Sequence, residues 1–349
     1  MVAPVTDQKV DTDSLVVTPA KPPRASRGGW AARMQINRFS GVYLWIGLIV
    51  LFAVWIPDTF LTNATLTGII MDQSITVVLA LGVLIALAAG QFDLSAAQTL
   101  GFAAVFHAWM MTVKDIDPVV STVLTLAACL VIGLVNGLVI AVVGINSFIA
   151  TLGTSSIILA VTSLVSGDKF VGPIEDGYRQ LALAKPLGVP ILFIYVLIFA
   201  VIVWYVLEHS PVGRRLQSTG ANPETARLVG VRTNRYIVGC MMASSFMAGI
   251  AGVLLLARIG SVSSTIGPSY LLPAFAGCFL GTTQLKPGRY NVWGTLLALF
   301  LLATGVKGFQ LASGQNWINA MFNGVALILA VGLAVIFERR RTQAGSRDS

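Results

Sequence analysis

The chain has 349 residues, of which 56% are hydrophobic and only 11% charged, and its mean hydropathy is +0.81. This composition excludes an ordinary soluble domain and is typical of a polytopic helical membrane protein. The formal net charge of +8 does not indicate nucleic-acid binding, because the basic residues gather in tails and loops between apolar segments. The three cysteines lie in apolar runs without metal-ligand spacing, so we interpret them as small buried side chains.

Residues 1–40 come first in chain order. Pro, Ser, Thr and Asp are frequent there and no apolar signal-peptide core occurs, so we expect a disordered cytoplasmic tail. Within it, Trp30–Phe39 carries Arg33 and Arg38 among aromatic and apolar residues. This pattern favours a short helix that lies at the membrane surface.

Residues 41–337 are predicted to form an all-α transmembrane domain of about ten helices, because a helix of roughly 20 residues crosses ~30 Å of hydrocarbon. The expected spans are 41–56, 66–89, 96–113, 119–143, 147–166, 188–207, 236–258, 261–281, 291–311 and 318–337. Ten crossings place both termini on one side, and most of the 23 lysines and arginines fall on that side. The positive-inside rule makes it the cytoplasmic side, with residues 338–349 as a C-terminal tail.

The span at 261–281 is the weakest. Its first half is polar, and Gly267, Pro268 and Pro273 interrupt it. Interrupted segments are tolerated at membrane depth only where protein buries them or where they line a wet cavity. We therefore predict a broken or re-entrant segment that still crosses.

A faint internal echo suggests inverted repeats. Asn146–Val161 can be aligned with Asn316–Val331, and both end in Ile-Leu-Ala-Val. By the predicted topology the two copies run in opposite directions, as inverted repeats do.

A second irregular stretch, Gly90–Ser95, separates two spans. Ser95 and Gln98 match a capping box that would start the next helix. A carboxylate at the depth of Asp93 is costly when it faces lipid and is a functional candidate when it faces a cavity. The alternative is an interfacial residue that supports the helix start, and Asp72 is open to the same two interpretations.

The longest hydrophilic break runs from Glu208 to Arg235, and its five arginines indicate a cytoplasmic loop. Asn222 is a good N-cap, Pro223 suits the first helical position and Glu224 faces the positive end of the helix dipole. Gly230 supplies a left-handed residue that ends the helix. A helix of about two turns is marginal alone in water, so we expect a partner to dock on it.

Three motifs then carry a resemblance: GQFDLS at Gly90–Ser95, NSFIATLGT at Asn146–Thr154 and GANPETARLVGV at Gly220–Val231. Together they resemble the permease subunits of bacterial ABC importers for ribose, xylose, galactose and other simple sugars, over residues 41–337. Gln91 and Phe92 depart from the family's usual Gly-Ile. The resemblance implies a cytoplasmic-membrane protein with a second permease chain, an extracytoplasmic sugar-binding protein and cytoplasmic ATPase subunits that bind ATP and Mg²⁺. No cofactor is expected in this chain itself.

The resemblance also implies roles for particular residues. The helix at Pro223–Val229 matches the element that couples to the ATPase, and the matching positions are Gly220, Asn222, Glu224, Ala226, Arg227 and Gly230. For the substrate pathway, Asp93, Ser95, Phe148 and Thr151 are expected to line or support a central cavity. The polar loop Gly167–Pro186 is expected outside, either as a contact for the binding protein or as a solvated connector.

Three alternatives stay open. A branched-chain amino acid ABC permease shares the general architecture. An ion-coupled secondary transporter would need charged coupling residues in several spans, whereas only Asp72 and Asp93 lie near membrane depth. A membrane enzyme is disfavoured because the sequence contains no P-loop, HExxH motif or nucleophile elbow, and His107 and His209 stand alone. ATP hydrolysis is therefore expected in a separate subunit.

Overall fold

The computed structural model describes residues 36–286, 288–315, 317–329 and 332. The tails predicted at both ends, and most of the surface helix predicted at Trp30–Phe39, lie outside these residues. Contacts divide the chain into two units, residues 1–36 and 37–349. The second unit contains the whole predicted transmembrane domain.

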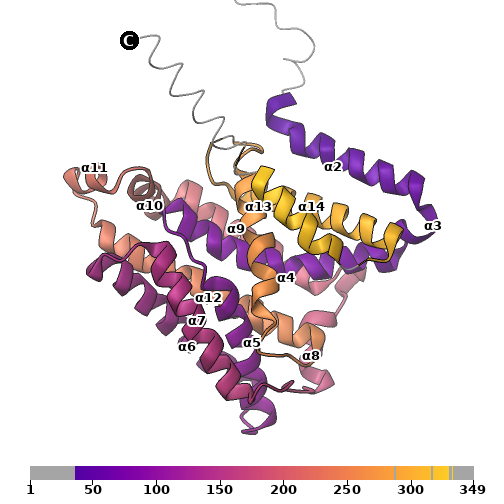
Figure 1. Cartoon of the computed structure of the whole chain (residues 1–349), viewed down its shortest axis with the longest axis horizontal. Coiled ribbons are helices and arrows are strands. Elements are labelled where there is room, and N and C mark those ends of the chain that lie inside the picture. The colour runs from indigo at the N-terminus through magenta and orange to yellow at the C-terminus, as the bar shows by residue number, and fades with distance from the viewer. Residues whose placement is uncertain (1–35, 287, 316, 330–331, 333–349) are drawn as a thin grey trace, which may run out of the picture. The chain divides into compact units, whose positions relative to one another are not determined.

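Helices account for most of the described residues, which confirms the all-α class. In chain order they are α2 (Ile36–Trp55), α3 (Pro57–Phe60), α4 (Asn63–Ala88), α5 (Ala96–Thr112), α6 (Pro118–Leu138), α7 (Ser147–Ser166), α8 (Asp176–Leu183), α9 (Ile191–Trp204), α10 (Pro211–Ala221), α11 (Pro223–Leu228), α12 (Thr233–Ile259), α13 (Leu271–Gly281) and α14 (Val292–Ser313), followed by a helix at 317–329 (Figure 1). Two π-helical turns, η2 (Val139–Val143) and η4 (Tyr205–His209), extend α6 and α9, and two 3₁₀ turns are η3 (Pro186–Gly188) and η5 (Gly267–Tyr270).

Six of these helices are long and apolar enough to cross a membrane: α4, α6 with η2, α7, α9 with η4, α12 and α14. The other four predicted spans correspond to shorter apolar stretches, namely Gly41–Trp55 within α2, α5, α13 and residues 317–329. Helices α6 and α7 expose long rows of Val, Leu and Ile. An apolar outer face is what a helix next to lipid requires, and the chain is a multi-pass membrane protein.

The predicted broken segment at 261–281 is confirmed. Helix α12 ends at Gly260 with a positive φ of 82°, and Val262 pairs with Val171 through two backbone hydrogen bonds of 2.9 and 3.0 Å. The turn η5 follows, and α13 has only 11 residues. At 1.5 Å per residue α13 is about 17 Å long, roughly half of the hydrocarbon thickness.

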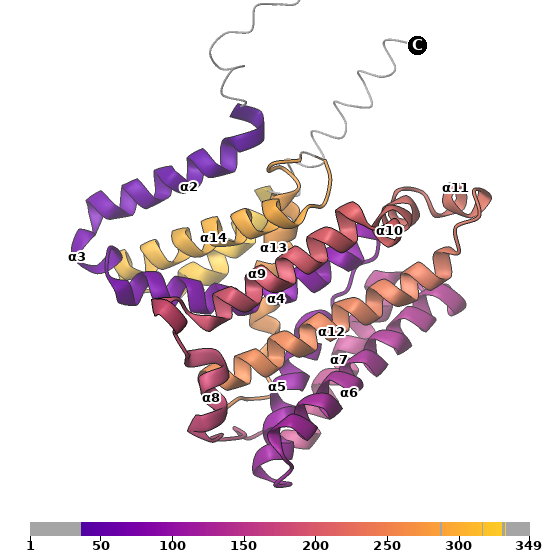
Figure 2. The same cartoon turned by 180° about the vertical axis from the view of Figure 1, so that it is seen from behind.

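Two long buried helices, α4 and α12, form the centre. Helix α12 packs against α4, α5 and α6, whereas α4 packs against α12, α13 and α14 and also against α9 (Figure 2). The order long helix, break, short helix, long helix therefore occurs twice, at 63–143 and at 233–313. The first long helix of each copy packs against the short helix and the second long helix of the other copy. Such reciprocal packing is expected of two structural repeats.

Small residues allow the central helices to approach one another closely. A Cβ on Gly133 of α6 would lie 2.6 Å from Met241 O of α12, and one on Gly252 of α12 would lie 2.4 Å from Leu100 O of α5. These contacts agree with a packing role for the glycines of the apolar segments. Gly324, in the helix at 317–329, has open space around it instead.

The two ends of α12 meet different parts of the chain. Its first residues follow α11, and α10 packs against it, while α8 packs near its far end (Figures 1 and 2). At that far end a Cβ on Gly260 would lie 3.2 Å from Arg179 Nε of α8. The loop Glu208–Arg235, called the polar loop from here on, and the predicted outer loop Gly167–Pro186 therefore lie at opposite ends of α12.

Candidate functional site

Helix α4 ends inside the protein, at a glycine. Gly90 has a φ of 73°. Its N–H donates to Leu87 O at 2.9 Å, and the Gln91 N–H donates to Ala86 O at 3.0 Å. This pair of bonds is the Schellman pattern, which closes a helix through a left-handed residue. The chain then crosses to α5 through a short irregular stretch that we call the α4–α5 break (residues 90–95).

Two hydroxyl groups of α7 hold this break. The Phe92 N–H donates to Ser147 Oγ and the Leu94 N–H donates to Thr151 Oγ1, both at 3.1 Å. Thr151 Oγ1 in turn donates to Ser147 O at 2.7 Å. Irregular backbone within a membrane protein needs such partners, because hydrocarbon offers none. The structure thus brings the first two sequence motifs into direct contact.

A buried polar cluster lies beside the break. Asp93 is fully buried, and its Oδ1 accepts the Ser95 N–H at 3.1 Å and the Ser95 hydroxyl at 2.6 Å. Asn136 of α6 donates to Ser95 Oγ at 2.8 Å. Within the described part of the chain, Asp93 Oδ2 and Asn136 Oδ1 accept no hydrogen bond of good geometry, although the Ser244 hydroxyl of α12 faces the Asp93 carboxylate. Burying such groups costs free energy, which makes this cluster a candidate for function.

The capping box predicted at the start of α5 is wrong. Ser95 is the N-cap, but its side chain makes no capping hydrogen bond. Its single hydroxyl proton goes to Asp93, and its oxygen accepts from Asn136. Gln98 lies elsewhere, beside Gly267 of η5, where an added Cβ would be 2.4 Å from Gln98 Oε1.

The four residues predicted for the substrate pathway therefore divide into two groups. Asp93, Ser95 and Thr151 lie together around the α4–α5 break and are buried. Phe148, on α7, is 51% exposed. Three of them are placed to support the break, and Phe148 alone presents surface.

The short helix predicted in the polar loop is α11, and both predicted caps are confirmed. Asn222 Oδ1 accepts the Thr225 N–H at 3.0 Å. Gly230 has a φ of 83°, and the Val231 N–H donates to Ala226 O at 2.9 Å, which again completes a Schellman pattern. Ala226 is the one buried residue of α11.

The outer surface of α11 is apolar at its end. Leu228 is 87% exposed and Val229 is 74% exposed. Glu224 is also exposed, whereas Arg227 turns back onto α12, where its Nε donates to Thr233 Oγ1 at 2.7 Å. Exposed apolar side chains on a short capped helix favour a docking surface for another protein. Arg227 positions the helix on α12 in this structure.

A second helix of the polar loop, α10, was not predicted. The sequence signal was present, because Ser210 accepts the Gly213 N–H at 3.1 Å and Pro211 occupies the first helical position. Asn222 and Pro223 have the same arrangement one helix later. We refer to α10 and α11 together as the α10–α11 segment.

The α10–α11 segment touches the α4–α5 break backbone to backbone. A Cβ on Gly220, at the end of α10, would lie 2.4 Å from Ala88 O and 2.8 Å from Gly90 N. A Cβ on Gly90 would lie 3.1 Å from Gly220 Cα. Neither position accepts a side chain without displacing backbone, so the two glycines allow the polar loop and the break to be in direct contact. This links the first and third sequence motifs.

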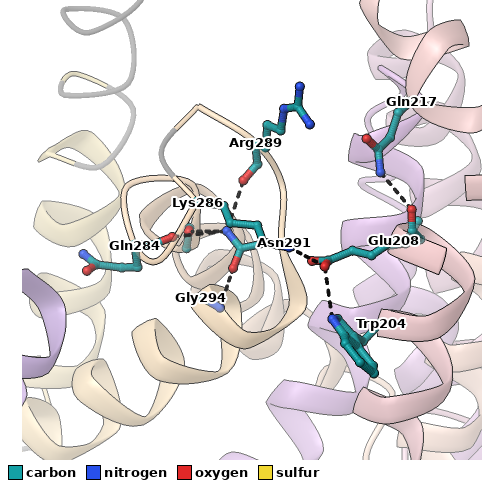
Figure 3. Close-up of polar contacts among 10 residues, drawn as sticks. Trp204, Glu208, Gln217, Gln284, Lys286, Arg289, Asn291 and Gly294 are labelled. Carbon is teal, nitrogen blue, oxygen red and sulfur yellow. Dashed lines mark hydrogen bonds and ion pairs between the residues drawn. The ribbon is translucent and has the colours of Figure 1, made fainter. Parts of the chain in front are cut away.

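A second loop meets the same end of the protein (Figure 3). Lys286, between α13 and α14, forms an ion pair with Glu208 of η4. Next to Glu208, Leu207 O accepts a hydrogen bond of 2.9 Å from Gln217 Nε2 of α10. Asn291 caps the start of α14. The turn between α13 and α14 is thereby connected, through η4, to the α10–α11 segment.

The opposite end carries an ion pair and a buried histidine. Asp72 of α4 forms an ion pair with Arg258 in the last turn of α12. His107 does not stand alone, because its Nε2 lies 2.6 Å from the Tyr178 hydroxyl of α8 and its Nδ1 lies 2.9 Å from Ser121 Oγ. These contacts hold α8, within the predicted outer loop, against α5 and α6.

Membrane-spanning helices, two internal breaks and a capped helix on a polar loop together define a polytopic transport permease. Comparison with known proteins agrees. The family described as "Branched-chain amino acid transport system / permease component" matches residues 65–331. The chain belongs to this permease family.

Several curated proteins are similar over most of their length. The ribose import permease protein of Bacillus subtilis (strain 168) is 28% identical, over 83% of this chain and 91% of that protein. The galactose/methyl galactoside import permease protein of Haemophilus influenzae is 31% identical, over 82% and 91%. The autoinducer 2 import system permease protein of Salmonella paratyphi B is 28% identical, over 84% and 85%. No solved structure matched. The resemblance stated from the motifs is confirmed.

Proposed function

We propose that this chain is the transmembrane permease subunit of an ATP-driven importer that moves a monosaccharide or a related polyol into the cell. Two of the relatives named above are import permeases for ribose and for galactose or methyl galactoside. The observation that carries the mechanism is the Gly220–Gly90 contact. It places the end of α10 against a break in a central transmembrane helix, and α10 leads directly into α11 with its exposed Leu228 and Val229.

In this proposal the α10–α11 segment receives a cytoplasmic ATPase subunit, which binds ATP and Mg²⁺. The exposed Leu228 and Val229 would be buried in the ATPase, and Glu224 would face its basic residues. Docking supplies the tertiary contacts that a helix of six residues lacks on its own. Movement of α10 would reach α4 directly, because no side chain separates their backbones at Gly220.

The orientation in the membrane follows from charge. The loop that contains α10 and α11 holds five arginines: Arg214, Arg215, Arg227, Arg232 and Arg235. Short loops rich in arginine stay on the cytoplasmic side during insertion. We therefore place the α10–α11 segment in the cytoplasm of a bacterial cell and the Asp72–Arg258 end outside. Both termini would then be cytoplasmic.

The importer would also contain a second permease chain and an extracytoplasmic sugar-binding protein. A second copy of this chain is the simplest partner, and it would cover part of the apolar surface of α6 and α7. Within the pathway, Asp93, Ser95 and Thr151 would hold the α4–α5 break, and Phe148 would face the cavity.

The two transport alternatives are less well supported. A branched-chain amino acid permease would fit the description of the family, but the relatives named above import sugars or autoinducer 2. An ion-coupled transporter needs a carboxylate that binds and releases the ion. Asp72 is paired with Arg258, and Asp93 is buried against Ser95, so neither is placed for that role.

Uptake by proteoliposomes tests the function. The complete importer, with its ATPase and its loaded binding protein, should accumulate labelled sugar only when ATP is present on the ATPase side. Liposomes that contain this chain alone should accumulate none, since the sequence has no P-loop. Accumulation by the chain alone, driven by an ion gradient, would contradict the proposal.

A further inference from the structure

A pocket of about 260 Å³ lies at the end of α4 and α12 that is farthest from the α10–α11 segment. Asp72 on its wall is 16 residues before the end of α4, or ~24 Å along the helix. Arg258 is 25 residues from the start of α12, or ~38 Å. The α12–α13 break (residues 260–270) borders the pocket through η5, and α14 and the helix at 317–329 complete it. All of the side chains that line the pocket belong to this chain.

The walls are polar although transmembrane helices form them. The Asp72–Arg258 ion pair and the carboxamides of Gln310, Asn319 and Asn323 line the pocket, together with apolar side chains such as Leu299 and Val306. Asn323 Nδ2 donates to Asn319 Oδ1 at 2.6 Å. Carboxamide, carboxylate and guanidinium groups each present two or more donors or acceptors in one plane. Their convergence suits a ligand that carries several hydroxyl groups.

The size agrees with such a ligand. At ~30 Å³ per water molecule, the pocket holds about eight or nine waters, a volume that a five- or six-carbon sugar can occupy. Tyr270 of η5 forms an aromatic wall, and Lys307 of α14 adds an ammonium donor. Polar groups inside a membrane protein are costly and usually mark the path of a polar ligand.

We infer that this pocket is a sugar-binding subsite within each permease chain, in which the Asp72–Arg258 pair and the amides of Gln310, Asn319 and Asn323 bind the hydroxyl groups of one monosaccharide. The inference rests on the proposed function for the class of ligand. It adds the place, at the extracytoplasmic end and beside the α12–α13 break, where sugar is held after its release from the binding protein.

Cysteine labelling of the reconstituted importer tests this site. Gln310→Cys and Asn319→Cys should each react with a membrane-impermeant thiol reagent added from outside. The native cysteines are buried and can remain in place. The probe is whichever aldopentose or aldohexose the wild-type importer accumulates, used at saturating concentration without binding protein. We expect that sugar to slow the labelling of both variants at least fivefold.

Two controls make the result specific. Leu187→Cys, on the exposed turn η3 outside the pocket, should label at the same rate with and without sugar. A stereoisomer that the importer does not accumulate should not protect any variant. Equal labelling of Gln310→Cys and Asn319→Cys with and without the transported sugar would overturn the inference, and so would a complete lack of labelling at both positions.

A pair of substitutions provides a second, independent arm. Gln310→Leu removes a polar wall of the pocket, whereas Gln315→Leu makes the same change five residues later, outside it. We expect sugar uptake to fall at least fivefold in the first and to stay at the wild-type level in the second, with equal amounts of assembled importer. Equal uptake by both variants would overturn the subsite. If the wild type accumulates no sugar at all, the proposed function fails instead.

Discussion

The two breaks in the central helices differ in what surrounds them. Neighbouring helices hold the α4–α5 break from three directions: side chains of α7 bind its backbone, Asn136 of α6 binds Ser95, and the backbone of Gly220 lies against Gly90. The α12–α13 break is also held by its neighbours, because Val262 pairs with Val171, the Ile174 N–H donates to Gly260 O at 3.0 Å, and Gly267 lies against the backbone of α5. It differs in that it also borders a polar pocket.

This difference suggests different roles for the α4–α5 break and the α12–α13 break. A break that neighbouring helices hold tightly can transmit a displacement, because it cannot absorb one. A break that borders open polar space can admit a ligand and change conformation around it. Under the proposed function, the repeated arrangement would serve energy coupling at one end and substrate binding at the other.

The largest effect is expected at the contact between α10 and α4. Gly220→Val would place side-chain atoms where Ala88 O and Gly90 N now lie, so α10 must move away from the break. We expect at least a tenfold loss of sugar uptake per assembled importer. The measurement is ATP-dependent uptake by proteoliposomes.

The matched control is Gly239→Val on α12, a glycine at which an added Cβ would have no heavy atom within 4 Å. It should keep most of the wild-type uptake. Wild-type uptake in Gly220→Val would show that the close approach of the two backbones is not needed, and would remove the difference between the two breaks.

A smaller effect is expected where α7 holds the break. Thr151→Val keeps the shape of the side chain but leaves the Leu94 N–H without its acceptor. An unpaired buried donor costs about 1–3 kcal/mol, so the thermal unfolding midpoint of the purified importer should fall.

Thr154→Val is the control, because the Thr154 hydroxyl donates only to Ala150 O within its own helix. Its midpoint should stay close to that of the wild type. If the two variants unfold at the same temperature, the hydrogen bonds from α7 do not stabilise the α4–α5 break.

The smallest effect is expected at the Glu208–Lys286 ion pair, which ties the turn between α13 and α14 to η4. The Lys286 side chain is half exposed, and pairs of this kind contribute about 0–1 kcal/mol. Lys286→Gln should therefore change the unfolding midpoint little and leave uptake near the wild-type level. A large loss of uptake would show that the turn between α13 and α14 also takes part in coupling. That result would contradict coupling through the α10–α11 segment alone.

The sequence was sufficient for the helical class, for most of the helices and for the caps of α11, because these depend on local composition and on single residues such as Asn222 and Gly230. Local signals also misled, since Ser95 has the spacing of a capping box but uses its hydroxyl for Asp93. The same N-cap and proline signal, at Ser210 and Pro211, could have predicted α10.

Long-range contacts could not be predicted in this way. Gly90 and Gly220 are 130 residues apart, and nothing in either motif shows that they meet. The pocket likewise joins Asp72 to Asn323 from opposite ends of the transmembrane domain. Such neighbours depend on how distant helices pack in three dimensions, which neither the motifs nor their spacing shows.

The most direct test of coupling through the α10–α11 segment is ATP hydrolysis by the reconstituted importer with loaded binding protein. In the pair Asn222→Ala/Gly230→Val, loss of the cap costs about 1 kcal/mol, and a β-branched residue is strained at positive φ. Gly188→Val is the control, because Gly188 has a φ of 81°, similar open surroundings and a place in the outer loop. We predict that the pair inserts normally but loses most substrate-stimulated hydrolysis, whereas the control keeps it. Normal assembly with full stimulated hydrolysis and uptake in the pair would contradict coupling through this segment.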